Sequence, residues 1–67
     1  MKQELIEELA NLLRDMVADM PEGLPMGPCY MAFMQKGIPF DVFNHVVAFM
    51  VERGDAEVRN HCLYPIT

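Results

Sequence analysis

Apolar residues recur at helical spacing near the start of the chain. Between residues 3 and 20 they are separated by charged and polar residues, in the i, i+3, i+4, i+7 pattern. The apolar positions are Leu5, Ile6, Leu9, Leu12, Leu13, Met16, Val17 and Met20. Such a stripe places one face of an α-helix against a core and leaves the other face in water. The pattern therefore predicts an amphipathic helix over residues 3 to 20.

Prolines and glycines interrupt this pattern directly after the first helix. The stretch PEGLPMGP, residues 21 to 28, contains residue types that a helix interior does not tolerate, and we expect a connecting loop there. Pro28 suits the first turn of a following helix, where its missing N–H is not needed. Gly37 suits a left-handed cap at the other end. A short second helix is therefore predicted over residues 28 to 36.

A third helix and a β-hairpin are predicted for the rest of the chain. Apolar residues again stand at helical spacing between residues 40 and 53, and Gly54 marks the end of this run. Two short apolar segments then flank Asn60-His61, which suits a two-residue turn because Asn accepts positive φ. The hairpin is predicted over residues 56 to 64. Pro65 limits it, since proline cannot donate to a central ladder.

The order helix, short helix, helix and two-stranded hairpin resembles the winged-helix family. The resemblance covers Met26 to Thr67 and rests on the apolar spacing and on VERG at the end of the third helix. It implies one domain over residues 1 to 67, mainly α with a small β-hairpin as the wing. It also implies that residues 39 to 53 enter the major groove of DNA, with the wing tip, Arg59 to Cys62, near phosphates.

The charges weaken the function that this resemblance implies. The chain has ten acidic and five basic residues and a net charge of −5 at pH 7, whereas phosphate binding depends on clustered Lys and Arg. On the third helix, Asp41 and Glu52 project away from the apolar stripe, where a DNA reader presents Arg, Lys, Asn or Gln. The candidate nucleic-acid contacts are Lys36, Asn44, His45, Arg53, Arg59 and His61.

The apolar content favours a protein partner instead. Apolar residues make up 52% of the chain and include seven methionines, which is more than so small a core comfortably hides. Methionine adapts to surfaces that repack against partners. The candidate partner-binding residues are Met20, Met26, Met31 and Met34. Core packing is the alternative: we expect it for Met31 and Met50, and for Met26 and Met34 both positions stay open.

Candidate chemistry is sparse. Cys29, His45, His61 and Cys62 have the residue count of a zinc site but not its close spacing. Cys29 stands near the predicted start of the second helix, where the helix dipole lowers a thiol pKa; the alternative, which we favour, is a small buried hydrophobe. Cys62 is expected to face the core or the first helix. No metal, cofactor or small-molecule substrate is predicted, and we expect no enzyme.

Two function classes remain for a chain with these properties. The N-terminus lacks the features of a signal peptide and no run approaches the roughly 18 apolar residues of a membrane span, so we expect a cytoplasmic protein that does not enter the membrane. The first class is a small regulatory or adaptor protein that uses a winged-helix scaffold to bind protein and to self-associate. The second is a dimeric nucleic-acid-binding transcriptional regulator.

Overall fold

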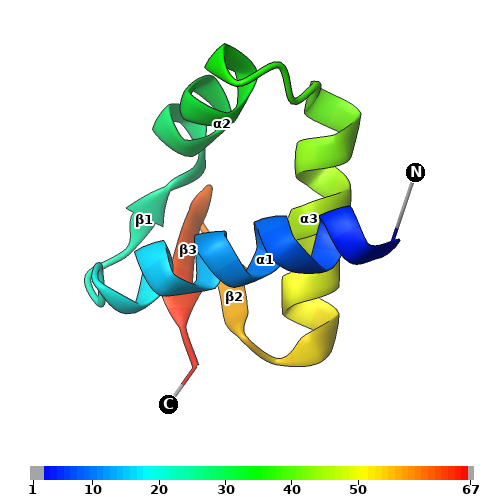
Figure 1. Ribbon diagram of the computed structural model, residues 1–67. Coiled ribbons are helices and arrows are strands. Elements are labelled where there is room, and N and C mark those ends of the chain that lie inside the picture. The colour runs from blue at the N-terminus through cyan, green and yellow to red at the C-terminus, as the bar shows by residue number, and fades with distance from the viewer. Residues whose placement is uncertain (1–2, 67) are drawn as a thin grey trace.

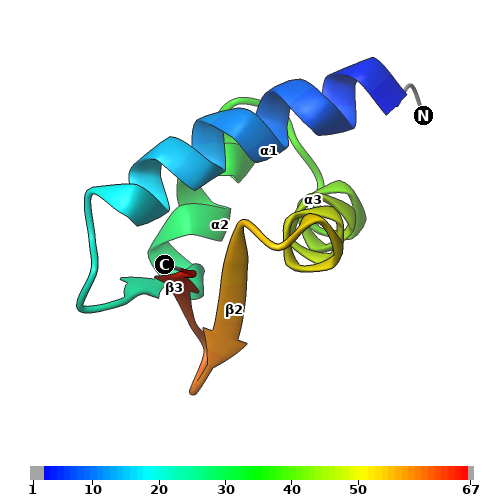
Figure 2. The same cartoon turned by 90° about the horizontal axis from the view of Figure 1, so that it is seen from below.

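A computed structural model describes residues 3–66, which form helices and short strands. The order is α1 (Gln3–Ala18), β1 (Leu24–Pro25), α2 (Met26–Gln35), α3 (Phe40–Arg53), β2 (Ala56–Arg59) and β3 (Cys62–Pro65). In Figure 1, α1 lies across β3 and α3, and these are the elements that it contacts most. Figure 2 shows α1 as one layer above α2, α3 and the sheet.

The first helix follows its predicted stripe and ends two residues earlier, at Ala18. Its buried residues are Ile6, Ala10, Leu13 and Val17. The neighbouring apolar flank is only partly covered, since Leu5 and Leu12 are each 47% exposed. The apolar face of α1 is thus wider than the surface that the rest of the chain covers.

The second helix begins earlier than predicted, at Met26, so Pro28 is its third residue. A proline is tolerated there because the first N–H groups of a helix have no partner inside the helix. The helix ends as predicted: Gly37 has φ 83°, its N–H donates to the Met34 carbonyl, and the Ile38 N–H donates to the Phe33 carbonyl. These bonds form a Schellman motif, which requires the left-handed residue that Gly37 supplies.

The third helix has the predicted bounds, and its end repeats the same motif. Gly54 has φ 86°, its N–H donates to the Val51 carbonyl, and the Asp55 N–H donates to the Met50 carbonyl. The buried residues of α3 are Phe43, Val46, Val47 and Met50. They meet the buried stripe of α1 and, from α2, Cys29 and Phe33, so the core lies between the three helices and the sheet.

The hairpin is confirmed and runs one residue further than predicted. Asn60 and His61 both have positive φ, 50° and 61°, as a type I′ turn requires. Pro65 lies opposite Ala56 at the end of β3, beyond the part of β3 that has neighbours on both sides. The proline therefore costs no hydrogen bond in the central part of the sheet.

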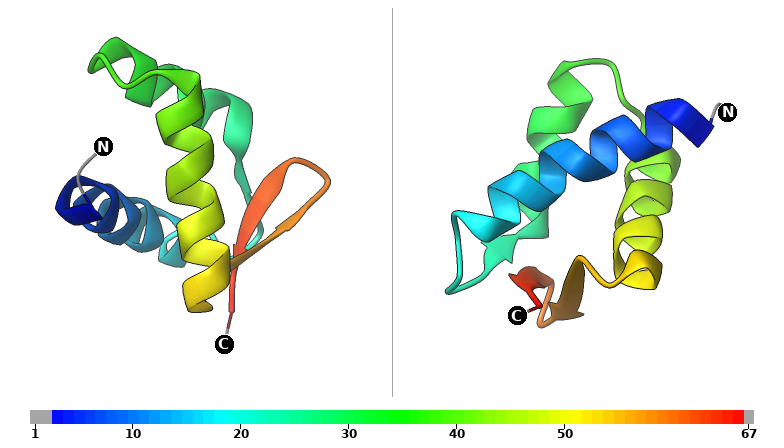
Figure 3. Two further views of the ribbon diagram at one scale, coloured as in Figure 1. Left: turned by 90° about the vertical axis from the view of Figure 1, so that its right-hand side faces the viewer. Right: turned by 60° about the horizontal axis from the view of Figure 1, so that its bottom comes forward.

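The sheet has a third strand that the sequence pattern did not predict. Strand β1 lies within the segment expected to be a loop and pairs antiparallel with β3, with Leu24 opposite Leu63 and Pro25 opposite Cys62. The strand order is β1-β3-β2, which makes β3 central. Three helices with this antiparallel sheet are compatible with a winged-helix-like topology. Figure 3 shows the hairpin projecting on the side of α3 opposite α1.

Candidate functional site

A pocket of about 350 Å³ opens between α2, α3 and the hairpin turn. Its lining residues are Met26, Gly27, Tyr30, Phe40, Phe43, Asn44 and His61. Among residues 3–66, this lining includes no Asp, Glu, Lys or Arg. We call the pocket, with the surface that continues it along α2 and α3, the groove. A concave, largely apolar surface of this kind suits a ligand or partner.

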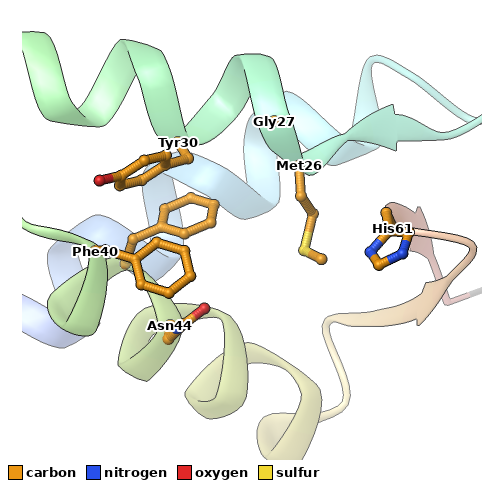
Figure 4. A pocket seen from close by; sticks show the side chains of 7 residues that line it. Met26, Gly27, Tyr30, Phe40, Asn44 and His61 are labelled. Atoms are coloured by element: carbon orange, nitrogen blue, oxygen red, sulfur yellow. The ribbon is translucent and has the colours of Figure 1, made fainter.

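Each wall of the groove comes from a different element. Met26 and Tyr30 stand one turn apart on α2, Phe40 and Asn44 stand one turn apart on α3, and His61 closes the open side from the hairpin turn (Figure 4). The turn is attached to α2, because the Met26 N–H donates to the His61 carbonyl at 3.0 Å. The left-handed turn conformation and this hydrogen bond together position the imidazole at the mouth of the groove.

An aromatic cluster connects the groove to the core. The Tyr30 and Phe40 rings meet edge to face with centroids 5.0 Å apart, and Tyr30 also contacts Phe43 at 5.7 Å. Phe43 in turn packs edge to face against Phe33 at 5.3 Å. Phe43 is buried but Phe40 is 54% exposed. Because the inner rings are held by the core, the outer rings form a firm apolar wall that remains open to solvent.

The apolar surface continues beyond the pocket on both helices. Met34 stands one turn after Tyr30 on α2 and is 47% exposed, and Met31 beside it is 56% exposed. On α3, Val51 is 43% exposed and follows Phe40 by eleven residues, which is three turns, so both lie on one side of that helix. Val58 on β2 is 42% exposed and shares a sheet face with Ala56 and Leu63.

The predicted nucleic-acid contacts do not form one surface. Asn44 and His61 share the groove, and His45 is exposed one position further along α3. Lys36 follows the C-terminal end of α2, whereas Arg53 lies at the C-terminal end of α3, at opposite ends of the molecule in Figure 1. Arg59 belongs to the sheet face that carries Glu57 and Tyr64, opposite to the core-facing side.

The two arginines are already engaged within the chain. Arg53 forms an ion pair with Asp55, donates from Nη2 to Asn11 Oδ1 at 2.8 Å, and covers the Phe49 ring at 5.0 Å. Arg59 pairs with Glu57 at 3.2 Å and lies 4.1 Å from the Tyr64 ring centroid. Each positive charge is therefore offset by a carboxylate two residues away along the chain.

The predicted partner-binding methionines separate into three environments. Met26 lines the groove, Met20 is half-buried in the turn after α1, and Met31 and Met34 are exposed on α2. The expectation that Met31 is core is wrong, whereas Met50 is fully buried. The reason is geometric: α2 buries Cys29 and Phe33, and Met31 points away from the side that they define.

Four residues of the pocket lining were not predicted as site residues: Gly27, Tyr30, Phe40 and Phe43. Sequence spacing alone marks Phe40 weakly, because the buried stripe of α3 begins one turn later, at Phe43. An aromatic residue outside that stripe in the first turn of α3 was the available signal. Tyr30 lies in the run CYMAFM, which is apolar on every side, so periodicity could not distinguish its core positions from its surface positions.

The cysteines do not form a reactive or metal-binding site in the described part of the chain. Cys29 is buried, as favoured, and burial raises the pKa of its thiol, which disfavours the reactive thiolate. The expectation that Cys62 faces the core is wrong: Leu63 takes the buried position of β3, and Cys62 alternates to the other face, half-buried. No group of three or more His, Cys, Asp or Glu within residues 3–66 is placed to hold a metal ion.

Comparisons with known proteins add no relative to these observations. No protein-family model matches this chain, and neither a curated protein nor a solved structure matches it. Within residues 3–66, no helix combines the length and apolar character needed to cross a bilayer.

Proposed function

We propose that this chain is a small non-enzymatic regulatory or adaptor protein whose winged-helix scaffold binds another protein through the groove. The observation that carries the proposal is Phe40, which is 54% exposed beside Tyr30 at the mouth of an uncharged pocket. Large aromatic side chains held firmly at a concave surface are typical centres of protein-protein interfaces, because a partner gains much buried area there at little entropic cost. A cytoplasmic location belongs to the same proposal.

The position of the groove supports a protein partner over DNA. In a winged helix, the third helix and the hairpin form the face that approaches the duplex. Here α3 and the hairpin turn present Phe40, Asn44 and His61, with Met26 of α2 beside them, and such a surface gives little attraction to phosphates. The pocket lining holds one imidazole, one amide and one phenol among apolar side chains, without a carboxylate or thiol that would activate a nucleophile.

Self-association is a second proposal of the same class, and a different observation favours it. Leu5 and Leu12 are seven residues apart on α1, lie on one flank of that helix, and are each 47% exposed. A second copy placed against this flank would cover both leucines. We expect this contact to leave the groove free, because the leucines are on α1 and the groove lies between α2, α3 and the hairpin.

The test places a photo-crosslinking amino acid, p-benzoylphenylalanine, at position 40 or at position 12 in the source cells. We expect position 40 to give a discrete adduct with another protein, and position 12 to give an adduct with a second copy. An adduct of position 40 with nucleic acid, or no adduct there, would contradict the proposed function. Light scattering over a wide concentration range checks self-association, and a constant mass of 7.7 kDa would contradict it.

Binding to mixed duplex DNA at two salt concentrations tests the alternative directly. A nucleic-acid-binding protein would bind more weakly at the higher salt, and Arg53→Ala with Arg59→Ala would reduce this binding. We expect no salt-sensitive binding, because both arginines are paired with carboxylates. Binding that the double variant abolishes would establish the nucleic-acid function in place of ours.

A further inference from the structure

We propose that the groove binds a cationic amphipathic helix of about three turns, lying along α3 with its basic flank toward that helix. This inference rests on the proposed function and specifies the chemistry of the partner. It is carried by the arrangement of apolar and acidic residues along α3, and by the absence of acids from the sequence of α2.

Two apolar-acid pairs repeat along the groove side of α3. Phe40 is followed by Asp41 and Val51 by Glu52, and the two pairs are eleven residues, or three helical turns, apart. The apolar members share one side of the helix, and the acids share the neighbouring, more exposed row. At 1.5 Å per residue the pairs are separated by about 16 Å. A partner helix of three turns spans that distance with its own residues at the same period.

The acids in this row are available to a partner. Within residues 3–66, the ion pairs engage Asp15, Asp55 and Glu57, and neither Asp41 nor Glu52 takes part in one. Both are exposed. The α2 edge of the groove differs, because the sequence from Met26 to Lys36 contains no acid and one base, at its C-terminal end. The groove therefore has a negative edge along α3 only, which orients a helix that is basic on one flank.

The volume of the pocket is large enough to admit apolar side chains of a partner helix. A volume of about 350 Å³ is at the lower end of the range for ligand pockets, which is about 300 to 1,000 Å³. Met26 and the Tyr30 and Phe40 rings offer apolar contacts at its mouth, and the Asn44 amide points into it (Figure 4). Large aliphatic or aromatic side chains near the centre of the partner helix would enter this space, while the outer turns meet Met34 and Val51.

Three synthetic helical peptides test this inference on the full chain. The first has Leu or Phe at i, i+4, i+7 and i+11 with lysines on one flank; the second has glutamates in place of the lysines; the third is a scramble of the first. We expect the first to bind at least about tenfold more tightly than the others at low salt, with NMR shift changes at Gly27, Asn44 and His61. Two exposed charge contacts and a matched apolar stripe account for this preference.

Two charge variants distinguish binding to the acidic residues of α3 from attraction of a cationic peptide to the net negative charge of the protein. Asp41→Asn with Glu52→Gln should weaken binding of the lysine peptide about threefold to tenfold, by the loss of two exposed ion pairs. Glu8→Gln with Asp15→Asn removes the same charge from the outer face of α1 and should change affinity by less than about twofold. Equal losses in both variants would overturn the inference, because they would show that only net charge matters.

The remaining outcomes distinguish the inference from the proposed function. If the lysine and glutamate peptides bind equally at the groove, the cationic helix is wrong and the protein-binding groove stands. If no peptide binds while position 40 still crosslinks to a protein, the partner has another chemistry and the inference is overturned. If light scattering gives a dimer and Phe40→Ala dissociates it, the occupant is a second copy of this chain.

Discussion

The two ends of α3 differ in how their polar and aromatic groups are used. At the C-terminal end, the Arg53 guanidinium is held by Asp55, by Asn11 of α1 and by the Phe49 ring, so charge, hydrogen bonds and aromatic surface are satisfied within the chain. At the N-terminal end, Phe40 meets Tyr30 on one side and solvent on the other. The C-terminal end of α3 is therefore bound to other parts of the chain, whereas the N-terminal end leaves an apolar surface exposed to solvent.

This difference explains why an arrangement compatible with a winged helix does not by itself indicate DNA binding. The basic residue that closes α3 stabilises the contact between α1 and α3, and an arginine bound in this way must break its hydrogen bonds before it can reach a phosphate. The open end offers aromatic area without positive charge. The exposed aromatic surface and the internally paired arginine are thus separated along a single helix, and mutations at each end should have different consequences.

The largest expected contrast lies within the aromatic cluster. Phe43→Ala should destabilise the domain by about 3 to 5 kcal/mol, because it opens a cavity at a side chain that is only 2% exposed. Phe40→Ala should cost about 1 kcal/mol or less, mainly the edge contact with Tyr30. Urea unfolding followed by circular dichroism measures both. Similar losses of unfolding free energy in the two variants would show that Phe40 contributes as much to the core as Phe43.

Two glycines near the opposite ends of α3 should respond with opposite signs to alanine. Gly54→Ala at the closed end should destabilise the domain by about 1 to 2 kcal/mol, because φ is 86° there and the cost is backbone strain, with no heavy atom near the added Cβ. Gly27→Ala beside the open end lies in the first turn of α2 and also has free space. It should stabilise by no more than about 0.5 kcal/mol, because glycine costs most in the middle of a helix. Thermal unfolding tests the pair, and destabilisation by both would contradict the assignment of strain to Gly54 alone.

Replacing each arginine tests how much the closed end depends on its link to α1. Arg53→Gln should cost about 1 kcal/mol, since it removes an ion pair and the long-range bond to Asn11. Arg59→Gln is the matched control: it also removes an arginine paired with an acid two residues away, but its pair is more than half exposed, and the cost should be about 0.5 kcal/mol or less. A double-mutant cycle with Asn11→Ala should show coupling to Arg53 and none to Arg59.

Some elements of the fold could be predicted from the sequence and others could not. The bounds of α3, the cap at Gly54 and the turn at Asn60-His61 follow from local rules of periodicity and positive φ, and the structure confirms them. Strand β1 could not be predicted, because two residues that include a proline have no period and acquire strand structure only by pairing with β3. Its partner is far away in sequence, so the third strand is a product of tertiary structure.

The groove was only partly predictable for a related reason. Asn44, His61 and Met26 were named as candidates, but for two different functions, and nothing in the sequence indicated that they share one pocket. The second helix is apolar on nearly every side, so its period does not say which residues are buried; Met31 was expected in the core and is exposed. The spacing of apolar residues tells which side chains share one face of a helix. Which of those faces is buried depends on how the helices and strands pack against each other.

The smallest expected effect concerns Cys29, which lies on the buried side of α2 behind the groove. Burial raises the pKa of its thiol above the ordinary value of 9.0, so the folded chain retains the proton when the unfolded chain has begun to lose it. The stability that this contributes is complete below pH 9.0 and is lost as pH rises through the folded pKa.

Urea unfolding at several pH values between neutral and strongly alkaline measures this effect. We expect the free energy of unfolding of the wild type to fall more steeply above pH 9.0 than that of Cys29→Ala. The variant loses some packing at all pH values but has no thiol to titrate, so the difference in slope isolates the thiol from the tyrosines and lysines that both proteins share. Equal slopes for the wild type and Cys29→Ala would mean that the open groove admits enough water to solvate the thiolate, and the wall of α2 behind the groove would then be less closed than its burial indicates.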